Sequence, residues 1–350
     1  MIDGHGDDVH LYEGHIKYNF SSNIYQRADL APLEKHLCEV ISCVRNYPEP
    51  SPVSLERLIS DKENISPDNI MVTAGAVDAI YLIAEKYGKE FGNRSVVNII
   101  RQPTFSEYAD ACAIYGGQVS TKDVKQPSVW WLCNPCNPTG EVVSNEEMLE
   151  TIDSQPDDLF VIDQSYEDYT MSELLSDSEI VVRKNVLLIH SMTKRYCIPG
   201  LRVGYVTSCE EIIKGLRMFR RPWSINSLAL EAGKWLVSHS YCPITIKADY
   251  LKEAQWLNGK LQKVEGLKVF PTSTNFMLAR LDNLSAALLK QFLVEHFGIL
   301  IRDASNFSGL DKSFFRVAAQ GHDENKLLVR AIEEYIQQET LRYKGTWNMN

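Results

Sequence analysis

The chain has 350 residues, enough for two domains or one large one, and it can bury a sizeable core without disulfides or metals. Its 44% hydrophobic and 23% charged residues are ordinary for a globular protein and exclude a disordered chain or a collagen-like fibre. The net charge is −10, so the chain lacks the broad basic surface of a nucleic-acid-binding protein. No apolar run approaches the ~20 residues that span a bilayer, so we expect no membrane partner.

The first predicted helix covers residues 31–44, and the Pro-rich stretch 47–52 ends it. From about residue 70 to 205, short apolar runs alternate with helical patterns. The runs are 70–72, 95–100, 129–132, 159–162, 186–189 and 203–206, and the helical patterns are 76–90, 105–116 and 145–153. This alternation predicts a mostly parallel sheet with helices on both faces.

The rest of the chain has a different pattern. A long helical stretch over 225–264 precedes a succession of strand, strand, helix, strand, strand and helix. These elements are 266–270, 275–280, 284–297, 299–303, 314–318 and 323–340. The succession predicts a smaller α+β domain against which the first 30-odd residues pack. We therefore expect an N-terminal segment over 1–40, a large domain over 41–245 and a small domain over 246–350.

The eight cysteines are scattered, and the acidic N-terminus is unlike a secretory signal. These features predict reduced thiols and a cytoplasmic protein. Cys133 and Cys136 form a C-x-x-C pair, but no second pair or histidine follows at the spacing of a zinc site. We expect two packed thiols and no metal.

In open parallel sheets, ligands bind beyond the carboxyl ends of the strands. The first run ends in Thr73-Ala74-Gly75-Ala76-Val77, whose backbone N–H groups could hold an anion at a helix start, although a plain turn would look the same. The later runs are followed by Asn134-Pro135-Cys136-Asn137-Pro138-Thr139-Gly140, by Asp163 and Tyr166, and by Ser191-Met192-Thr193-Lys194. The stretch Gly200–Gly204, which contains Arg202, comes next.

Each of these pieces is common, but their combination is specific. N-P-x-N-P-T-G, D-x-x-Y and S-x-x-K, with an arginine eight residues after the lysine, resemble the pyridoxal-phosphate (PLP) enzymes of the aspartate-aminotransferase fold type, the class I/II aminotransferases. The resemblance implies the α/β fold of PLP-dependent transferase fold type I. That fold has a large domain with a mostly parallel seven-stranded sheet and a smaller α+β C-terminal domain.

The resemblance also implies roles for these residues. Lys194 would form the Schiff base with PLP, and Asp163 would keep the pyridine nitrogen protonated so that the ring acts as an electron sink. Asn137 and Tyr166 match the residues that bind the ring hydroxyl, and Tyr166 counts among the catalytic groups. The cofactor phosphate would be held by Ser191, Arg202 and the backbone of Gly75, Ala76 and Val77.

Two tyrosines complete the expected cofactor site. Tyr108 matches the P-T-x-x-x-Y of histidinol-phosphate aminotransferases, which implies an aromatic ring stacked on PLP; the alternative is a plain core residue. Tyr47 resembles the tyrosine that reaches the cofactor phosphate of the neighbouring subunit. That match implies a homodimer with shared active sites, whereas the alternative is a buried loop tyrosine.

Substrate choice depends on two arginines at successive strand ends, Arg302 and Arg316. Guanidinium groups bind carboxylate or phosphate in a bidentate way, so two of them suggest a doubly anionic substrate, although one could be a structural ion pair. The stretch 298–325 resembles threonine-phosphate decarboxylases of cobalamin synthesis. So do Pro222–Asn226 and the opening, in which His5-Gly6 precedes residues 20–24.

This second resemblance implies decarboxylation of L-threonine O-3-phosphate to (R)-1-aminopropan-2-yl phosphate and CO2. The substrate-binding residues would be Arg302, Arg316, Asn137, His5, Ser22 and Asn23. The alternative is histidinol-phosphate or related amino transfer, because the choice depends on which Cα bond stands perpendicular to the PLP ring. A regulatory PLP-fold protein would usually carry a fused DNA-binding domain, for which the chain has no spare length.

The chain departs from the decarboxylases at several positions. Ala304 and Asp7 stand where they usually have Cys and Gly, and Tyr25-Gln26 replaces an Asn-Pro. The phosphate loop ends in Asp78 rather than in the Glu of G-N-G-x-x-E, which questions the geometry of that loop. None of these changes removes a catalytic group.

Overall fold

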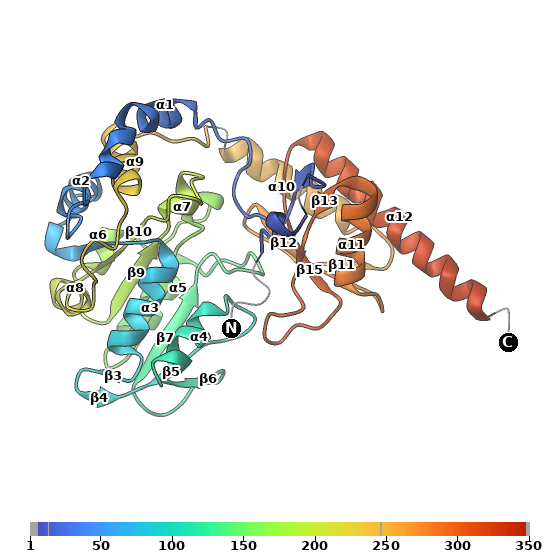
Figure 1. Cartoon of the computed structure of the whole chain (residues 1–350). Helices are drawn as coiled ribbons and strands as arrows, with labels where there is room; N and C mark the ends of the chain where they lie inside the picture. Colours follow the sequence, from blue (N-terminus) through green and yellow to red (C-terminus); the bar gives the residue numbers. More distant parts are fainter. Residues whose placement is uncertain (1–5, 13, 246, 348–350) are drawn as a thin grey trace. The chain divides into compact units, whose positions relative to one another are not determined.

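The computed structural model describes residues 6–12, 14–245 and 247–347 (Figure 1). The chain divides into two units. The first contains Met1–Tyr25, Asn137–Glu141 and Ile246–Asn350, and the second contains Gln26–Cys136 and Val142–Thr245. Residues 26–40 therefore lie in the second unit rather than in the predicted N-terminal segment. No helix within the described ranges is long and apolar enough to cross a membrane.

A seven-stranded sheet forms the second unit, in the order β2-β10-β9-β8-β7-β5-β6. Its strands are β2 (Ile70–Thr73), β5 (Val97–Ile99), β6 (Gln118–Ser120), β7 (Ser128–Cys133), β8 (Leu159–Asp163), β9 (Val186–His190) and β10 (Gly204–Ser208). Only β10 runs antiparallel to its neighbours. The predicted mostly parallel seven-stranded sheet is confirmed. Every residue of the central strands β8 and β9 is buried, as expected for a sheet covered on both faces.

Helices cover both faces of this sheet. The helices are α1 (Ala31–Val40), α2 (Val53–Glu63), α3 (Ala76–Tyr87), α4 (Glu107–Ile114), α5 (Asn145–Ser154), α6 (Asp177–Ile180), α7 (Met192–Arg195), α8 (Glu210–Arg217) and α9 (Ser227–Ser238). One apolar core joins α3, α4 and α8 to the sheet, and two others lie under α5 and α6 and under α2 and α9. Leu33 of α1 is buried in the α2–α9 core, which explains why this helix belongs to the second unit.

Short elements complete the second unit. The predicted helix over 31–44 ends at Val40 and continues as the 3-10 helix η2 (Ile41–Arg45). Two further 3-10 turns, η3 (Pro67–Asn69) and η4 (Glu167–Tyr169), precede β2 and follow β8. Strands β3 (Glu90–Phe91) and β4 (Arg94–Ser95) form a small antiparallel hairpin. Of these elements, η4 matters most for the site, because it follows Tyr166 directly.

An antiparallel four-stranded sheet forms the first unit, in the order β11-β12-β15-β14. Its elements are η1 (Val9–Leu11), β11 (Leu267–Val269), β12 (Phe276–Leu281), β14 (Arg302–Asp303), β15 (Phe314–Ala318), α10 (Lys247–Leu261), α11 (Ala286–Phe297) and α12 (His322–Trp347). Strand β1 (Tyr18–Asn19) pairs in parallel with β13 (Ile299–Leu300). The start of the chain thus supplies a strand that the sequence pattern did not predict.

Candidate active site

The predicted cofactor residues of the second unit gather at one edge of its sheet. Strands β8 and β9 are parallel, and β2 shares their direction because β10 runs antiparallel to both β2 and β9. Asp163 ends β8, Ser191 follows β9, and Gly75 comes two residues after β2. The carboxyl ends of these strands therefore meet at one edge, where ligands bind in such sheets.

Asp163 is a buried acid that accepts two hydrogen bonds. Its side chain is 4% exposed, and its two oxygens accept hydrogen bonds from the Tyr108 hydroxyl and the Ser165 backbone N–H, each at 2.8 Å. In the described part of the chain, no lysine or arginine forms an ion pair with it. Burial raises the pKa of Asp163, and the hydrogen bonds from Ser165 and Tyr108 and the charge of His190 only partly offset this rise. A protonated pyridine nitrogen would supply the missing cation.

Tyr108 lies next to this acid. It is 1% exposed, and its ring stacks on that of Trp131 with centroids 5.7 Å apart. Burial, followed by the charge of Asp163, raises the pKa of Tyr108 well above its usual value, so the hydroxyl stays a donor. The stacking of Tyr108 on PLP remains a prediction; the structure shows that Tyr108 contacts Asp163, the acid predicted to bind the pyridine nitrogen.

The structure brings Lys194 and Tyr166 together. The Lys194 Nζ lies 5.7 Å from the centroid of the Tyr166 ring, and Tyr166 is buried. The Tyr169 hydroxyl donates to the Lys194 carbonyl at 3.0 Å. The D-x-x-Y segment and the S-x-x-K segment therefore form one contact region, although 28 residues separate the tyrosine from the lysine.

The start of α3, where an anion site is predicted, lies beside Arg202. Gly75 is the N-cap of this helix with φ +90°, and a Cβ added there would lie 2.8 Å from Nη2 of Arg202. The exposed Arg202 donates to the Pro199 carbonyl at 3.1 Å and, among the described residues, forms no ion pair. The Asp78 carboxylate accepts from the Ala74 N–H at 2.9 Å and so closes the loop in place of the family's Glu. A guanidinium beside the first turn of a 12-residue helix fits a phosphate.

Ser191, Ala76 and Val77 complete the predicted phosphate set. Ser191 is buried directly before α7, while Ala76 and Val77 are half-buried in the first turn of α3. The first four N–H groups of a helix have no partner inside it. These residues therefore suit the phosphate role predicted for them.

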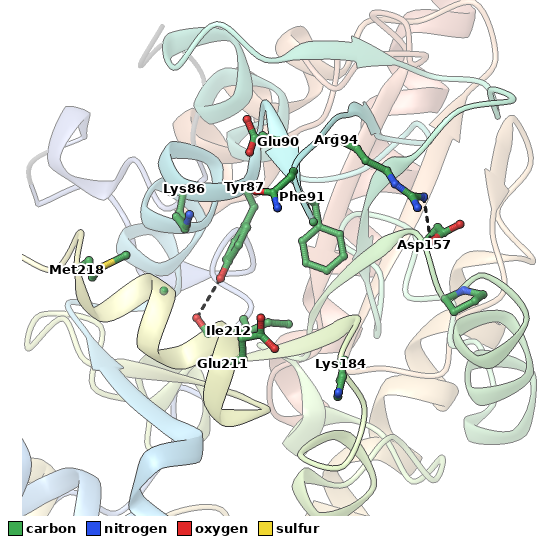
Figure 2. Close-up of a pocket in the computed structure, with 14 residues that line it drawn as sticks. Lys86, Tyr87, Glu90, Phe91, Arg94, Asp157, Lys184, Glu211, Ile212 and Met218 are labelled. Carbon is green, nitrogen blue, oxygen red and sulfur yellow. Dashed lines mark hydrogen bonds and ion pairs between the residues drawn. The ribbon is translucent and has the colours of Figure 1, made fainter.

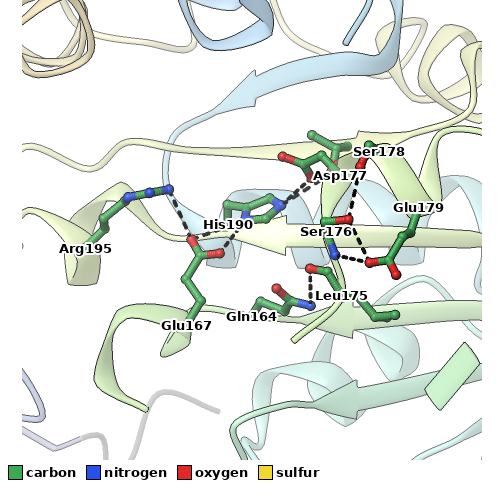
Figure 3. Close-up of polar contacts among 10 residues, drawn as sticks. Gln164, Glu167, Leu175, Ser176, Asp177, Ser178, Glu179, His190 and Arg195 are labelled. Carbon is green, nitrogen blue, oxygen red and sulfur yellow. Dashed lines mark hydrogen bonds and ion pairs between the residues drawn. The ribbon is translucent and has the colours of Figure 1, made fainter. Parts of the chain in front are cut away.

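A buried ionic cluster lies behind this edge, and no sequence motif signalled it (Figure 3). The imidazole of His190 lies between two carboxylates, with Nδ1 3.1 Å from Glu167 and Nε2 3.0 Å from Asp177. Arg195, the neighbour of Lys194, contacts Glu167 at 3.6 Å and Asp168 at 3.3 Å. The only sequence hint was a histidine at the end of an apolar strand.

A second candidate site lies in the first unit, where Arg302 on β14 stands directly opposite Arg316 on β15. The two are 8% and 5% exposed. Arg302 donates to the Asp303 carbonyl and to the side-chain oxygen of Asn306, which sequence reasoning did not single out. Arg316 donates to the Asn137 side chain and, at 2.8 Å, to the Ser21 carbonyl. All four of these acceptors are neutral oxygens.

The start of the chain lies against this arginine pair. A Cβ added to Gly6 would lie 3.0 Å from Cδ of Arg302 and 3.4 Å from Nη2 of Arg316. The predicted substrate residues Ser22 and Asn23 are buried directly after Ser21. His5, which was also predicted to bind substrate, lies outside the described residues. The structure thus groups Asn137, Ser22 and Asn23 near the arginines within one unit.

Tyr47 lies on the surface of the second unit. It is 86% exposed, and its ring lies 5.5 Å from that of Trp223, which is 51% exposed. The alternative of a buried loop tyrosine is therefore wrong. An exposed aromatic pair of this kind is available for contact with another chain.

A further pocket of about 630 Å³ opens in the second unit and contains none of the predicted site residues (Figure 2). Asp157 and Lys184, which precede β8 and β9, help to line it, so it lies at the amino-terminal edge of the sheet. Arg94 pairs with Asp157 at 2.9 Å, and the Tyr87 hydroxyl donates to the Ile212 carbonyl at 3.1 Å. The pocket is separate from the edge that carries Asp163 and Ser191.

The sequence profile of the aminotransferase class I and II family matches residues 16–332. The chain belongs to this family. The crystal structure of L-threonine-O-3-phosphate decarboxylase from Porphyromonas gingivalis is 34% identical and has a TM-score of 0.87; the similarity covers 91% of this chain and 99% of that one.

Two curated relatives carry different names. Histidinol-phosphate aminotransferase of Thermoanaerobacter pseudethanolicus is 27% identical, over 93% of this chain and 95% of the relative. Threonine-phosphate decarboxylase of Salmonella typhimurium is 24% identical, over 91% of each. Within this family, both reactions are therefore represented among proteins similar to the chain.

Proposed function

We propose that this protein is a PLP-dependent decarboxylase that converts L-threonine O-3-phosphate to (R)-1-aminopropan-2-yl phosphate and CO2 for cobalamin biosynthesis. The observation that carries the proposal is the buried pair of Arg302 and Arg316. Guanidinium groups bind phosphate and carboxylate in a bidentate way, so two of them opposite each other suit a substrate that carries both groups. The 34% identity to the Porphyromonas gingivalis decarboxylase supports this choice.

PLP would be held by the edge of the second unit's sheet. When bound, it supplies an electron sink for the bond that breaks at Cα of the substrate. Lys194 would attach it, Asp163 would hold the proton at its pyridine nitrogen, and Tyr166 would donate to its ring hydroxyl together with Asn137. Its phosphate would be bound by Ser191, Arg202 and the N–H groups of Gly75, Ala76 and Val77.

The two arginines would divide the anions of the substrate. A firm ground-state grip on the carboxylate that must leave would raise the barrier to its departure. At least one arginine should therefore hold the phosphate, which stays on the product. Asn306 and Asn137, which accept from Arg302 and Arg316, would keep the two guanidinium groups oriented. Gly6 lies so close to both arginines that a side chain there would press on Arg302.

The active enzyme would be a cytoplasmic homodimer with shared active sites. The exposure of Tyr47 and Trp223 supports a contact through which Tyr47 reaches the cofactor phosphate of the neighbouring subunit. All eight cysteines are free in the structure, which suits a reducing compartment. Small phosphorylated amino acids, rather than nucleic acids or membranes, would be its partners.

The second candidate is histidinol-phosphate aminotransfer. The 27% identity to the Thermoanaerobacter enzyme and the P-T-x-x-x-Y that contains Tyr108 favour it. Incubation of PLP-loaded protein with L-threonine O-3-phosphate separates the two. The decarboxylase assignment predicts CO2 release without any keto acid. Dependence on 2-oxoglutarate with no CO2, or turnover of histidinol phosphate alone, would establish the aminotransferase instead.

A further inference from the structure

The cluster around His190 joins three segments, two of which carry predicted cofactor residues (Figure 3). His190 is the last residue of β9 and precedes Ser191, so it leads directly into the turn of Lys194. Glu167 follows Tyr166 at the start of η4. Asp177 opens α6 and accepts a hydrogen bond from the Thr207 hydroxyl of β10. The imidazole is thus the link between the β9 end, the Tyr166 segment and the α6–β10 layer.

The ring has little freedom to move. It is stacked on Tyr205 with centroids 4.4 Å apart and planes at 14°, and His190 is 4% exposed. Both ring nitrogens lie within 3.1 Å of a carboxylate oxygen. A neutral imidazole has only one N–H donor, so contact with two carboxylates requires the doubly protonated cation.

The electrostatic surroundings of His190 also favour the doubly protonated ring. Burial alone would lower the pKa of His190, but the charges of Asp177 and Glu167 outweigh it and raise the pKa well above the usual value. Burial would likewise raise the pKa of Asp177 and of Glu167, yet His190 brings the pKa of both below its usual value. The other groups that face the cluster are Arg195, Asp168, Tyr205 and Asp163, and the pKa of Tyr205 is raised, chiefly by burial.

We propose that His190 is a positioning residue of the PLP site, in which a doubly paired imidazolium ties the segment of Tyr166 to the strand that leads into Ser191 and Lys194. This inference rests on the proposed cofactor role of that edge. His190 touches neither substrate nor cofactor in this account. It acts through Glu167, which neighbours Tyr166, and through the backbone that it shares with Ser191, and it also places a positive charge near Asp163.

The test uses the full-length protein with three variants. His190→Gln removes the cation and leaves Glu167 and Asp177 facing a neutral amide. Glu167→Gln keeps an oxygen that can accept from Nδ1 but removes one charge. His322→Gln is the matched control, because His322 forms the same kind of pair with Glu253 at 3.0 Å in the first unit and is 48% exposed.

Four quantities are measured for each variant. They are the dissociation constant of PLP, the pH dependence of the visible band of protein-bound PLP, turnover, and urea unfolding of the apoprotein. We expect His190→Gln to weaken PLP binding about tenfold, to shift the pH midpoint of the band and to lower turnover on the order of 100-fold, since small misplacements have effects of this size. Glu167→Gln should shift PLP binding in the same direction by less, and His322→Gln should leave it within twofold.

Imidazole NMR of histidine-labelled apoprotein provides a readout that does not require PLP-loaded enzyme. The His190 signal, identified by its loss in His190→Gln, should remain that of a protonated ring at pH values above the ordinary histidine range. Because the pKa is raised, the stabilising charge is present below the ordinary histidine range and is lost only as the pH rises through the raised pKa. PLP affinity should therefore fall on the alkaline side in wild type and be less pH-dependent in His190→Gln.

The proposal is overturned if folded His190→Gln binds PLP within twofold of wild type with an unchanged band, even when its urea midpoint falls, since that is the result of a merely structural role. It is also overturned if the His190 signal titrates in the ordinary histidine range. Should His190→Gln fail to fold, unchanged PLP affinity and band in Glu167→Gln overturn it. Wild type that binds no PLP overturns it together with the cofactor assignment, whereas wild type that binds PLP but releases no CO2 contradicts only the decarboxylase.

Discussion

Two buried groups of cations in this molecule differ in their hydrogen-bond partners. In the second unit, His190 contacts one carboxylate on each side of its ring, and Arg195 shares Glu167 with it. In the first unit, Arg302 and Arg316 face each other across two strands, and the hydrogen bonds described above go to neutral oxygens. Burial lowers the pKa of Arg302, in keeping with a cation removed from water.

The difference shows how to tell an internal cluster from a binding site. A buried cation that the chain itself neutralises contributes to the fold and to the placement of its neighbours. Arg302 and Arg316 are oriented by hydrogen bonds to neutral oxygens, and the charges of Asp303 and Asp8 also act on Arg302; two oriented guanidinium groups suit a ligand with two anionic groups. On this account the second unit provides the chemistry with PLP, and the first unit selects the substrate.

The largest effect should come from Lys194→Ala, which acts on the chemistry in the second unit. Without the amine, PLP cannot be linked to the chain, and turnover of every substrate should fall by at least about 1,000-fold. Borohydride reduction followed by mass spectrometry should find no PLP adduct. Lys184→Ala, at the exposed amino-terminal edge of the same sheet, is the control and should keep the adduct. A reducible adduct that persists in Lys194→Ala would show that another lysine is used.

Asp163→Asn should keep PLP bound but reduce turnover by about 100- to 1,000-fold, because a neutral amide cannot hold the pyridine nitrogen protonated. In the apoprotein, by contrast, the same substitution should increase stability at neutral pH relative to wild type. The pKa of Asp163 is raised in the fold, so its contribution to stability is present at low pH and is lost as the pH rises through that pKa.

Thermal unfolding of the apoproteins across pH tests this sign. Relative to wild type, Asp163→Asn should gain stability as the pH rises from the acid range to neutral. In the turnover assay, near-normal activity of Asp163→Asn would show that another group keeps the pyridine nitrogen protonated. A stability difference that does not change with pH would contradict the raised pKa.

Arg302→Ala and Arg316→Ala should affect the choice of substrate in the first unit rather than the chemistry in the second unit. A hydrogen-bonded charge contributes about 1.5–3 kcal/mol, so loss of the arginine that holds the phosphate should lower kcat/KM for phosphothreonine roughly 10- to 100-fold. Threonine itself should be affected much less, and the preference for the phosphorylated substrate should shrink. Steady-state kinetics on both substrates provide the measurement. Equal losses on both substrates in both variants would assign these arginines to the fold or to the amino-acid carboxylate.

The smallest effect is expected for Tyr47→Phe, which removes one hydroxyl. PLP retention should weaken by about tenfold, the size expected for one hydrogen bond to a charged group. In mixed dimers of Tyr47→Phe and Lys194→Ala, the one site with an intact lysine should retain PLP as wild type does, because its tyrosine comes from the other subunit. Confirmed heterodimers that lose PLP from this site as readily as Tyr47→Phe itself would contradict a shared site.

Much of the fold could be predicted because strand cores and helix faces are local patterns. Buried strands such as β8 and β9 are continuous apolar runs, and their alternation with helices specifies a parallel sheet. Two features could not be predicted. Strand β1 has two residues and pairs with β13 across about 280 residues, so it has no pattern of its own. The assignment of α1 to the second unit depends on Leu33 fitting a core built by α2 and α9.

The site divides in the same way. Lys194, Asp163 and Tyr166 stand in short motifs with fixed spacing, so the sequence identified them. Arg302 and Arg316 could be singled out, but their cross-strand register could not, because it depends on the pairing of β14 with β15. His190 contacts residues 13 and 23 positions away: Asp177 lies in a segment without a motif, and Glu167 lies next to the D-x-x-Y motif but is not part of it. The proposed role of His190 could therefore be inferred only from the three-dimensional structure.

The most direct test of the account follows the fate of two labels in one substrate. L-threonine O-3-phosphate carrying ¹³C in its carboxylate and ¹⁵N in its amine is incubated with PLP-loaded wild type and 2-oxoglutarate, and the products are observed by NMR. The account predicts that ¹³C appears as CO2 or bicarbonate, while ¹⁵N stays in an aminopropanyl phosphate. Transfer of ¹⁵N to glutamate, with ¹³C retained in a phosphorylated keto acid, would contradict the decarboxylase and establish an aminotransferase.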